Sequence, residues 1–211
     1  MALRISTLHH RLNSRPEAEG DDVHLTERRW FAVRTAARHE KKASHELQRA
    51  GIESYVPLRE RVYRYASKQT TRQLPLLTGY VFVRIRKDEE GRVLRAHYVS
   101  RFVRLGPVRR RVTDAEIELL RTLSADRSLD WESVEEVFDF SAGTPVEIIR
   151  GPLVGVRGIY LRKKNKKTFV ISFGALDACL STCEIDPTFL VALDGSSVDG
   201  IGSRDTDGQS L

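Results

Sequence analysis

The apolar pattern of this chain changes character once, near residue 124. Before that point apolar residues form strand-like runs, such as Tyr80-Val81-Phe82-Val83-Arg84-Ile85, and also recur at helical spacing. After it they occur only in short strand-like runs that glycines interrupt. Short runs of β-branched and aromatic residues are typical of strands, and recurrence every three to four residues is typical of amphipathic helices. The change therefore predicts an α+β chain with two domains, the first α/β and the second all-β.

The first domain is predicted over residues 28–124. A strand is expected over 29–34, then a helix through AARHEKKASHELQRA that Gly51 ends. Extended segments at 55–58, 61–65 and 72–77 lead into the strand at 80–85 and predict an antiparallel hairpin or meander. A helix over 88–96 and a strand over 99–105 follow. Thr113 and Glu116 form a capping box for a third helix, whose apolar stripe is Ile117, Leu120 and Leu123. These elements predict an α/β sandwich on an antiparallel sheet.

The second domain is predicted over residues 140–193. Strand-like runs at 146–149, 154–161 and 169–171 flank a basic turn at 162–167, which predicts a small five-stranded β-barrel. The acidic segment 125–139 contains Trp131 and Val134 among carboxylates and is interpreted as a linker; a short helical turn is the alternative. Residues 1–27 and 194–211 are polar and are expected to be disordered tails.

The positive charge is concentrated in the first domain. The whole chain has a formal net charge of +6, whereas residues 30–124 alone contain 21 basic and 10 acidic residues. Such a surplus is typical of a surface that binds nucleic acid, because Lys and Arg neutralise phosphates. The alternative is an ordinary solvated surface.

Several function classes lack support in the sequence. We find no phosphate-cradling glycine loop, no nucleophile signature and no set of metal ligands, so we expect no enzyme activity and no cofactor. Cys179 and Cys183 are interpreted as structural, because two ligands do not make a zinc site. With no membrane-spanning run and no signal-peptide core, the sequence predicts a cytoplasmic protein that does not associate with membranes.

The first domain contains the short motifs Trp30-Phe31-Ala32-Val33, Glu40-Lys41-Lys42, Tyr55-Val56-Pro57, Gly79-Tyr80-Val81-Phe82-Val83 and Phe102-Val103. In this order and spacing they resemble the NusG family of transcription elongation factors. The second domain is similar to a KOW domain, an SH3-like barrel, at Gly143, Val146, Gly151, Pro152, Leu153, Gly155 and Gly158, followed by Glu184-Ile185. The resemblance implies that the first domain is the family's N-terminal, or NGN, domain, and that the protein is a monomeric transcription factor.

In this family the NGN domain binds the clamp helices of the largest RNA polymerase subunit. By position, the resemblance assigns this contact to Pro57, Leu77, Thr78, Gly79, Tyr80, Phe82 and Phe102. The alternative for Phe82 and Phe102 is a place in the core.

Specialised family members also contact the displaced non-template DNA strand. The matching positions are His39, Lys42, Arg92 and Arg95, with Arg109, Arg110 and Arg111 close by in sequence. Their chemistry suits phosphates, and exposed solvated side chains are the alternative for each of them.

Two departures from the family pattern favour a specialised paralogue, similar to the RfaH and polysaccharide-operon regulators. The usual Phe-Pro-Gly-Tyr is Leu77-Thr78-Gly79-Tyr80 here, and Asp177-Ala178-Cys179 replaces the Phe-Gly-Arg of the general factor. The second change puts contact with Rho or a ribosomal protein in doubt. The function expected is operon-specific elongation or antitermination; the alternatives are the general factor and an RNA- or ribosome-binding KOW protein.

Overall fold

Alternating side chains give the first sheet two buried faces. The computed structural model describes residues 22–65, 67–104, 106–134, 143–163, 166–176 and 178–193. Its first sheet is antiparallel and contains β1 (Arg29–Thr35), β2 (Glu53–Tyr55), β5 (Tyr80–Ile85) and β6 (Val99–Phe102), in the order β2-β5-β1-β6. Odd-numbered residues of β1 and β5, such as Phe31 and Val81, face one core, and even-numbered residues, such as Ala32 and Phe82, face another.

Two short helical segments cover the first of these faces. Helix α2 (Glu40–Arg49) buries Ala43 and Leu47, and Gly51 follows it at φ +73°, the conformation that commonly ends helices. The 3₁₀ turn η1 (Lys87–Glu89) leads into α3 (Glu90–Leu94), which buries Val93 in the same core. The predicted strands at 29–34 and 80–85 and this glycine stop are confirmed. Both helices are present but shorter than predicted, and the strand predicted over 99–105 ends at Phe102.

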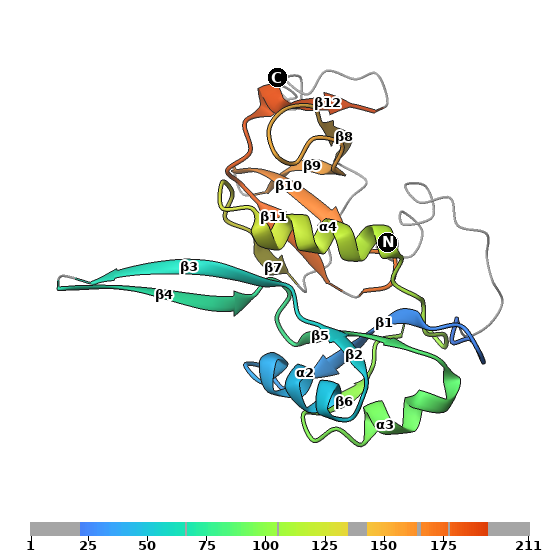
Figure 1. Ribbon diagram of the computed structural model, residues 1–211. Coiled ribbons are helices and arrows are strands. Elements are labelled where there is room, and N and C mark those ends of the chain that lie inside the picture. Colours follow the sequence, from blue (N-terminus) through green and yellow to red (C-terminus); the bar gives the residue numbers. More distant parts are fainter. Residues whose placement is uncertain are drawn as a thin grey trace, which may run out of the picture.

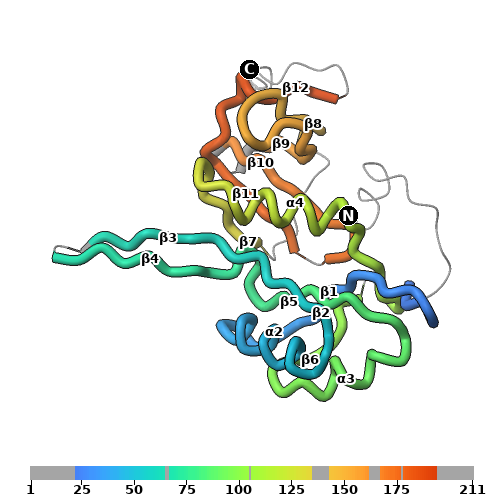
Figure 2. The backbone as a smooth tube through the Cα atoms, viewed as in Figure 1, coloured from blue at the N-terminus to red at the C-terminus, as the bar shows by residue number. Residues whose placement is uncertain are grey.

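The predicted hairpin is a long ribbon. Strands β3 (Leu58–Tyr65) and β4 (Lys68–Pro75) pair antiparallel along their whole length. The ribbon projects sideways from the rest of the molecule, as Figures 1 and 2 show.

Helix α4 (Asp114–Ala125) lies between the first sheet and the second (Figure 1). The capping box is confirmed: Glu116 N donates to Thr113 Oγ1 at 3.2 Å, and Thr113 N donates to Glu116 Oε2 at 2.7 Å. The predicted stripe Ile117, Leu120 and Leu123 is buried in a cluster that contains residues of both sheets. The two halves of the chain therefore share one continuous apolar core.

The second sheet is antiparallel, with the order β12-β8-β9-β10-β11-β7. Its strands are β7 (Glu132–Val134), β8 (Thr144–Ile148), β9 (Arg157–Lys163), β10 (Lys166–Ser172), β11 (Cys179–Thr182) and β12 (Leu190–Ala192), with the 3₁₀ turn η3 (Pro187–Phe189) before β12. Where the sequence predicted five strands, the described residues form six, and closure into a barrel stays a prediction.

The additional strand, β7, lies in the segment predicted as a linker. It pairs with β11, and Trp131 just before it is 1% exposed, with its ring centroid 6.1 Å from that of Phe169. The linker interpretation missed this, because carboxylates around Trp131 dominate the local composition. The rest of the predicted linker, residues 135–139, lies outside the described residues.

The N-terminal segment also differs from its prediction. Residues 22–27, assigned to a disordered tail, contact the first domain: Asp22 N donates to Arg109 O at 3.1 Å, and His24 O accepts from Lys87 N at 2.9 Å. Val23 packs against the core under α2. Residues 1–21 and 194–211 lie outside the described part of the chain.

Candidate functional site

The even-numbered face of β1 and β5 is an apolar surface in the middle of the first sheet. Trp30 and Ala32 on β1, Tyr80 and Phe82 on β5, and Leu77 before β5 form it, and we call it the β1–β5 apolar face. Leu77, Tyr80 and Phe82 are each 0% exposed. Three residues of the predicted polymerase contact are thus completely covered in this conformation, as the core alternative for Phe82 implied.

The turn before β5 holds Tyr80 in place. Gly79 adopts φ +78°, which favours glycine, and its N–H donates to the buried Glu40 Oε1 at 2.7 Å. The Arg34 guanidinium lies 4.0 Å from the centroid of the Tyr80 ring, a cation–π contact. Thr78 is exposed at the tip of the turn. The positioning role of Glu40 was not predicted, although Glu40 stands in one of the motifs.

The remaining residues of the predicted polymerase-binding set lie elsewhere. Pro57 is buried, and its carbonyl accepts from Leu76 N at 2.7 Å. Phe102 faces the other core, beneath α2, and its ring lies 5.1 Å from the Arg109 guanidinium carbon. Because strand alternation puts Phe102 on the opposite face from Tyr80, the two rings do not form one surface in this conformation.

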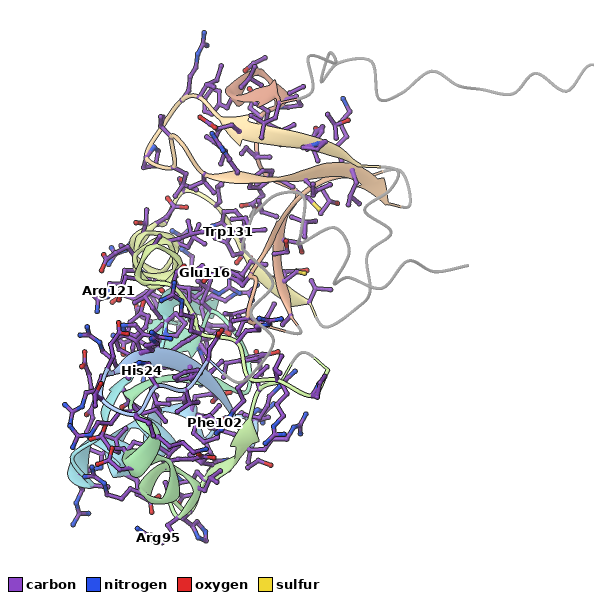
Figure 3. All side chains as sticks on the ribbon, turned by 90° about the vertical axis from the view of Figure 1, so that its right-hand side faces the viewer. His24, Arg95, Phe102, Glu116, Arg121 and Trp131 are labelled. Atoms are coloured by element: carbon purple, nitrogen blue, oxygen red, sulfur yellow. The ribbon has the colours of Figure 1, made fainter. Side chains whose placement is uncertain are left out.

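Helix α4 and residues 173–176 cover the β1–β5 apolar face, and we call them the cover. Phe173, Ala175 and Leu176 belong to the same apolar cluster as Tyr80 and Phe82. Gly174 N donates to Glu116 Oε1 at 2.9 Å, so one carboxylate joins α4 to the second half of the chain. Asp130 N also donates to Glu184 Oε2 at 2.5 Å. Glu116, Arg121 and Trp131 mark this junction in Figure 3.

The second predicted surface is centred on the start of α2. His39 stacks on Tyr98 with ring centroids 4.9 Å apart, and Lys42 Nζ lies 5.7 Å from the Tyr98 ring centroid. A shallow pocket beside them is lined by Lys41, Lys42, His45, Glu46, Arg49 and Tyr98. Basic groups around an aromatic ring suit a single-stranded nucleic acid. Tyr98 was not named from the sequence, and the adjacent His97-Tyr98 pair was the available signal.

Arg92 and Arg95 differ from each other in environment. Arg95 is exposed, whereas Arg92 is half-buried and donates to Glu89 Oε1 at 2.9 Å and to Ala50 O at 3.2 Å. The Glu89 carboxylate, 1% exposed, also accepts from Arg28 Nη2 at 2.6 Å. Burial raises the pKa of Glu89, but the bonds from Arg28 and from the Arg86 backbone outweigh it and hold the pKa below its ordinary value.

Replacing Glu89 by Gln is expected to destabilise the first domain by about 1.5–3 kcal/mol at pH 7, because bonds to a charged acceptor are lost. Because folding lowers the pKa of Glu89, the ionised carboxylate stabilises the fold above the ordinary carboxyl pKa. This stabilisation is lost as the pH falls through the pKa that Glu89 has in the folded protein. Urea unfolding at pH 7 and pH 3.5 should therefore show a difference between variant and parent that shrinks at the lower pH. Asp88→Asn is the control, since its exposed pair with Arg86 is screened by solvent. Equal losses in both variants would contradict this role for Glu89.

The three consecutive arginines, Arg109 to Arg111, also differ in their exposure to solvent. Arg109 is 3% exposed and donates to Glu90 Oε1 at 2.5 Å. Arg111 is exposed, and its N–H donates to Asp22 Oδ2 at 2.7 Å. Arg110 is half-buried. In this conformation Arg109 joins α3 to the loop and does not lie on an open basic surface.

The glycine-rich motif of the second half forms a tight turn between β8 and β9. Gly151 and Gly155 have φ of +84° and +87°, and Gly155 N donates to Ile148 O at 2.8 Å. Val146 and Leu153 are buried, Pro152 is exposed, and Gly143 and Gly158 lie where a Cβ would collide with neighbours. The motif therefore specifies backbone geometry.

Ala178 and Cys179, in the place of the general factor's Phe-Gly-Arg, are buried, and burial raises the pKa of the Cys179 thiol to about 11. A thiol with that pKa stays protonated and unreactive near neutral pH. Cys183 is exposed. Asp177 lies outside the described residues, as do the side chains of most of the basic turn 162–167; Lys167 is exposed.

Among the described residues we find neither a helix that could span a membrane nor a group of metal ligands. A bilayer would need a helix longer and more apolar than any that these residues form. In the same part of the chain, no three His, Cys, Asp or Glu side chains are grouped as ligands for a metal ion.

Comparison with known families decides the relationship of the first domain. A family model described as "Transcription termination factor nusG" matches residues 28–121, or 94 of the 211 residues. This segment is NusG-like. The match ends inside α4, so the NusG-like domain includes the whole β1–β5 apolar face and the first two turns of its cover.

The solved structures that are similar to this chain have low sequence identity to it. One titled "Domain interaction in Thermotoga maritima NusG" is 17% identical, covers 79% of this chain and 98% of its own, and has a TM-score of 0.48. Two conformations of an MjSpt4:Spt5 complex are 19% and 20% identical, cover 78% of this chain and 97% and 96% of theirs, and both have a TM-score of 0.27. Comparison with curated proteins finds no match. The NusG-like domain thus rests on the family model and on its own geometry.

Proposed function

We propose that this protein is a transcription elongation or antitermination factor that binds RNA polymerase through its NusG-like domain. One observation carries the proposal: this domain has a second apolar face, with Tyr80 and Phe82, on the side of the sheet opposite α2 and α3, where α4 and residues 173–176 cover it. Large apolar rings on a sheet are suited to receive an amphipathic helical hairpin. The partner proposed is the clamp-helix hairpin of the largest polymerase subunit.

The conformation described here is a closed state of such a factor. Binding requires the cover to leave the β1–β5 apolar face. The hydrogen bond between Glu116 and Gly174 stabilises the closed state, so its loss shifts the equilibrium between closed and open states toward the open one. A factor that is closed when free acts only where polymerase or nucleic acid stabilises the open state. That behaviour fits an operon-specific paralogue. The basic surface where His39 and the exposed Lys42 meet Tyr98, together with the exposed Arg95, is the proposed contact for the displaced DNA strand.

The test uses the full chain with a photo-crosslinking p-benzoylphenylalanine in place of Thr78, an exposed member of the proposed contact. Crosslinks to the largest subunit of the cognate polymerase are expected, because Thr78 borders the β1–β5 apolar face. Adding Glu116→Ala should raise the crosslinked fraction about tenfold, since a hydrogen bond to a charged group contributes about 1.5–3 kcal/mol to the closed state. Tyr80→Asp is unsuitable here, because a carboxylate at this fully buried position would unfold the domain.

Two controls make the result specific. Thr113→Ala removes the same helix cap and leaves the Glu116 bond to Gly174, so it should not raise crosslinking. The crosslinker at Gln48, exposed on α2 across the sheet, should give no product with the clamp. No crosslink from Thr78 in either the parent or the Glu116→Ala chain would disprove polymerase binding by this face. Equal yields in those two chains would disprove only the closed state.

A further inference from the structure

The β3–β4 ribbon places four of its five basic residues on one face. Cross-strand partners of an antiparallel pair point to the same side, and successive residues alternate. The register Arg61↔Arg72 and Tyr63↔Thr70 therefore defines a face that contains basic and aromatic residues and no carboxylate among the described side chains, with the members Arg59, Arg61, Tyr63, Lys68, Thr70, Arg72 and Leu74. The ribbon's single acidic residue, Glu60, is on the other face with Val62, Arg64, Gln69, Thr71 and Gln73. We call the first of these the basic ribbon face.

Two arginines on this face stand directly opposite each other. Arg61 and Arg72 are register partners, and their guanidinium carbons lie 5.9 and 5.4 Å from the ring centroid of Tyr63. Like charges in opposed positions destabilise a strand pair unless an anion lies near them. The half-buried Tyr63 ring attracts both guanidiniums and so helps to hold them at the surface.

The protein's own carboxylates neutralise arginines only at the base of the ribbon, where it joins the rest of the molecule. Asp130 forms an ion pair with Arg59 and lies 3.6 Å from Arg61, and Arg127 pairs with Glu60 on the opposite face at 2.6 Å. Further out, the described residues place no carboxylate within ion-pairing distance of Lys68 or Arg72, and both are exposed. The outer half of the basic ribbon face thus presents uncompensated positive charge.

We propose that the basic ribbon face binds double-stranded DNA through its phosphates. The ribbon has eight residues in each strand, about 26 Å at 3.3 Å per residue, and it projects from the body where a duplex has free access (Figure 2). The major groove of B-form DNA admits a two-stranded ribbon, whereas that of A-form RNA is too narrow. Single-strand binders offer exposed aromatic platforms in a groove, but Tyr63 is half-buried with two guanidiniums beside it.

The test measures binding of the full chain to a fluorescent 30-base-pair DNA of mixed sequence, by anisotropy over a range of salt concentrations. Lys68→Gln/Arg72→Gln, which removes the two uncompensated charges of the outer half, is expected to weaken binding at least tenfold at low salt. The slope of log K against log salt should flatten by about 1.8, because two phosphates are no longer neutralised. Arg150→Gln/Arg157→Gln removes two exposed charges from the turn between β8 and β9 and from the start of β9, and it should change the affinity less than threefold.

Three results would overturn the proposal. The first is an equal loss of affinity in the two double variants, which would indicate net charge alone. The second is binding of single-stranded DNA or of double-stranded RNA as tight as that of the DNA duplex. The third is a parent chain that binds none of these. Thermal melting followed by circular dichroism verifies that both variants fold, as exposed substitutions should allow. Since the assay contains free DNA and no polymerase, its outcome is independent of the function proposed above.

Discussion

Replacing Trp131 by Ala is expected to lower the free energy of unfolding by about 3–5 kcal/mol, the usual cost of removing a large buried aromatic side chain. Trp131 is 1% exposed and lies in the cluster that unites both halves of the chain. Its loss leaves a cavity between Phe169 and the apolar residues around it. Urea unfolding followed by circular dichroism measures the effect.

Two further variants make the Trp131 experiment decisive. Trp131→Phe should lower the free energy of unfolding less than Trp131→Ala does, because a phenyl ring retains part of the indole volume. It also breaks no hydrogen bond, since the buried Trp131 Nε1 has no partner among the described residues. Val154→Ala, at an apolar residue that is 60% exposed, should change the stability little. A loss below about 1 kcal/mol for Trp131→Ala would show that the segment behaves as the linker predicted from its composition.

Gly158→Ala is expected to destabilise the second sheet by about 3 kcal/mol, at the upper end of the range for overpacking a core. A Cβ at this position would lie 2.5 Å from Val170 O and 2.7 Å from two atoms of the Phe169 ring. The carbonyl belongs to β10, which pairs with β9 through Phe169↔Tyr160 and Val170↔Ile159, so it cannot move without breaking the strand pair. Thermal or urea unfolding gives the measurement.

The matched control for Gly158 is the same substitution in α3. At Gly91 a Cβ would have only the flexible end of Arg95 nearby, at 3.9 Å, and the residue has no positive φ. Gly91→Ala should therefore be neutral or stabilise by about 0.5–1 kcal/mol through helix propensity. If Gly158→Ala were as well tolerated as Gly91→Ala, the close approach of β9 and β10 would be disproved.

Local patterns predicted the elements of the first domain well. Four signals depend only on neighbours within a few residues: the apolar runs of β1 and β5, the helical spacing in α2, Gly51 and the Thr113–Glu116 capping box. Such signals survive in any tertiary context, because backbone hydrogen bonding and side-chain period decide them. The hairpin was predicted, but the sorting of its charges needed the cross-strand register.

Long-range contacts decided the remaining features. Trp131 is buried because Phe169, 38 positions away, packs on it, and β7 exists because β11 pairs with it. Phe102 and Tyr80 are separated by the sheet, although the resemblance placed them in one contact surface. Arg109 carries the same charge as Arg110 and Arg111, yet it alone of the three is buried, where it pairs with Glu90 of α3.

The sequence by itself determined the main strands and helices of the first half and the apolar residues of the β1–β5 face. Only the tertiary structure decided that α4 and residues 173–176 cover this face. The physical reason is that an apolar side chain gains the same free energy against a helix of its own chain as against a helix of a partner. Periodicity identifies a face that must be buried, and the fold determines what buries it.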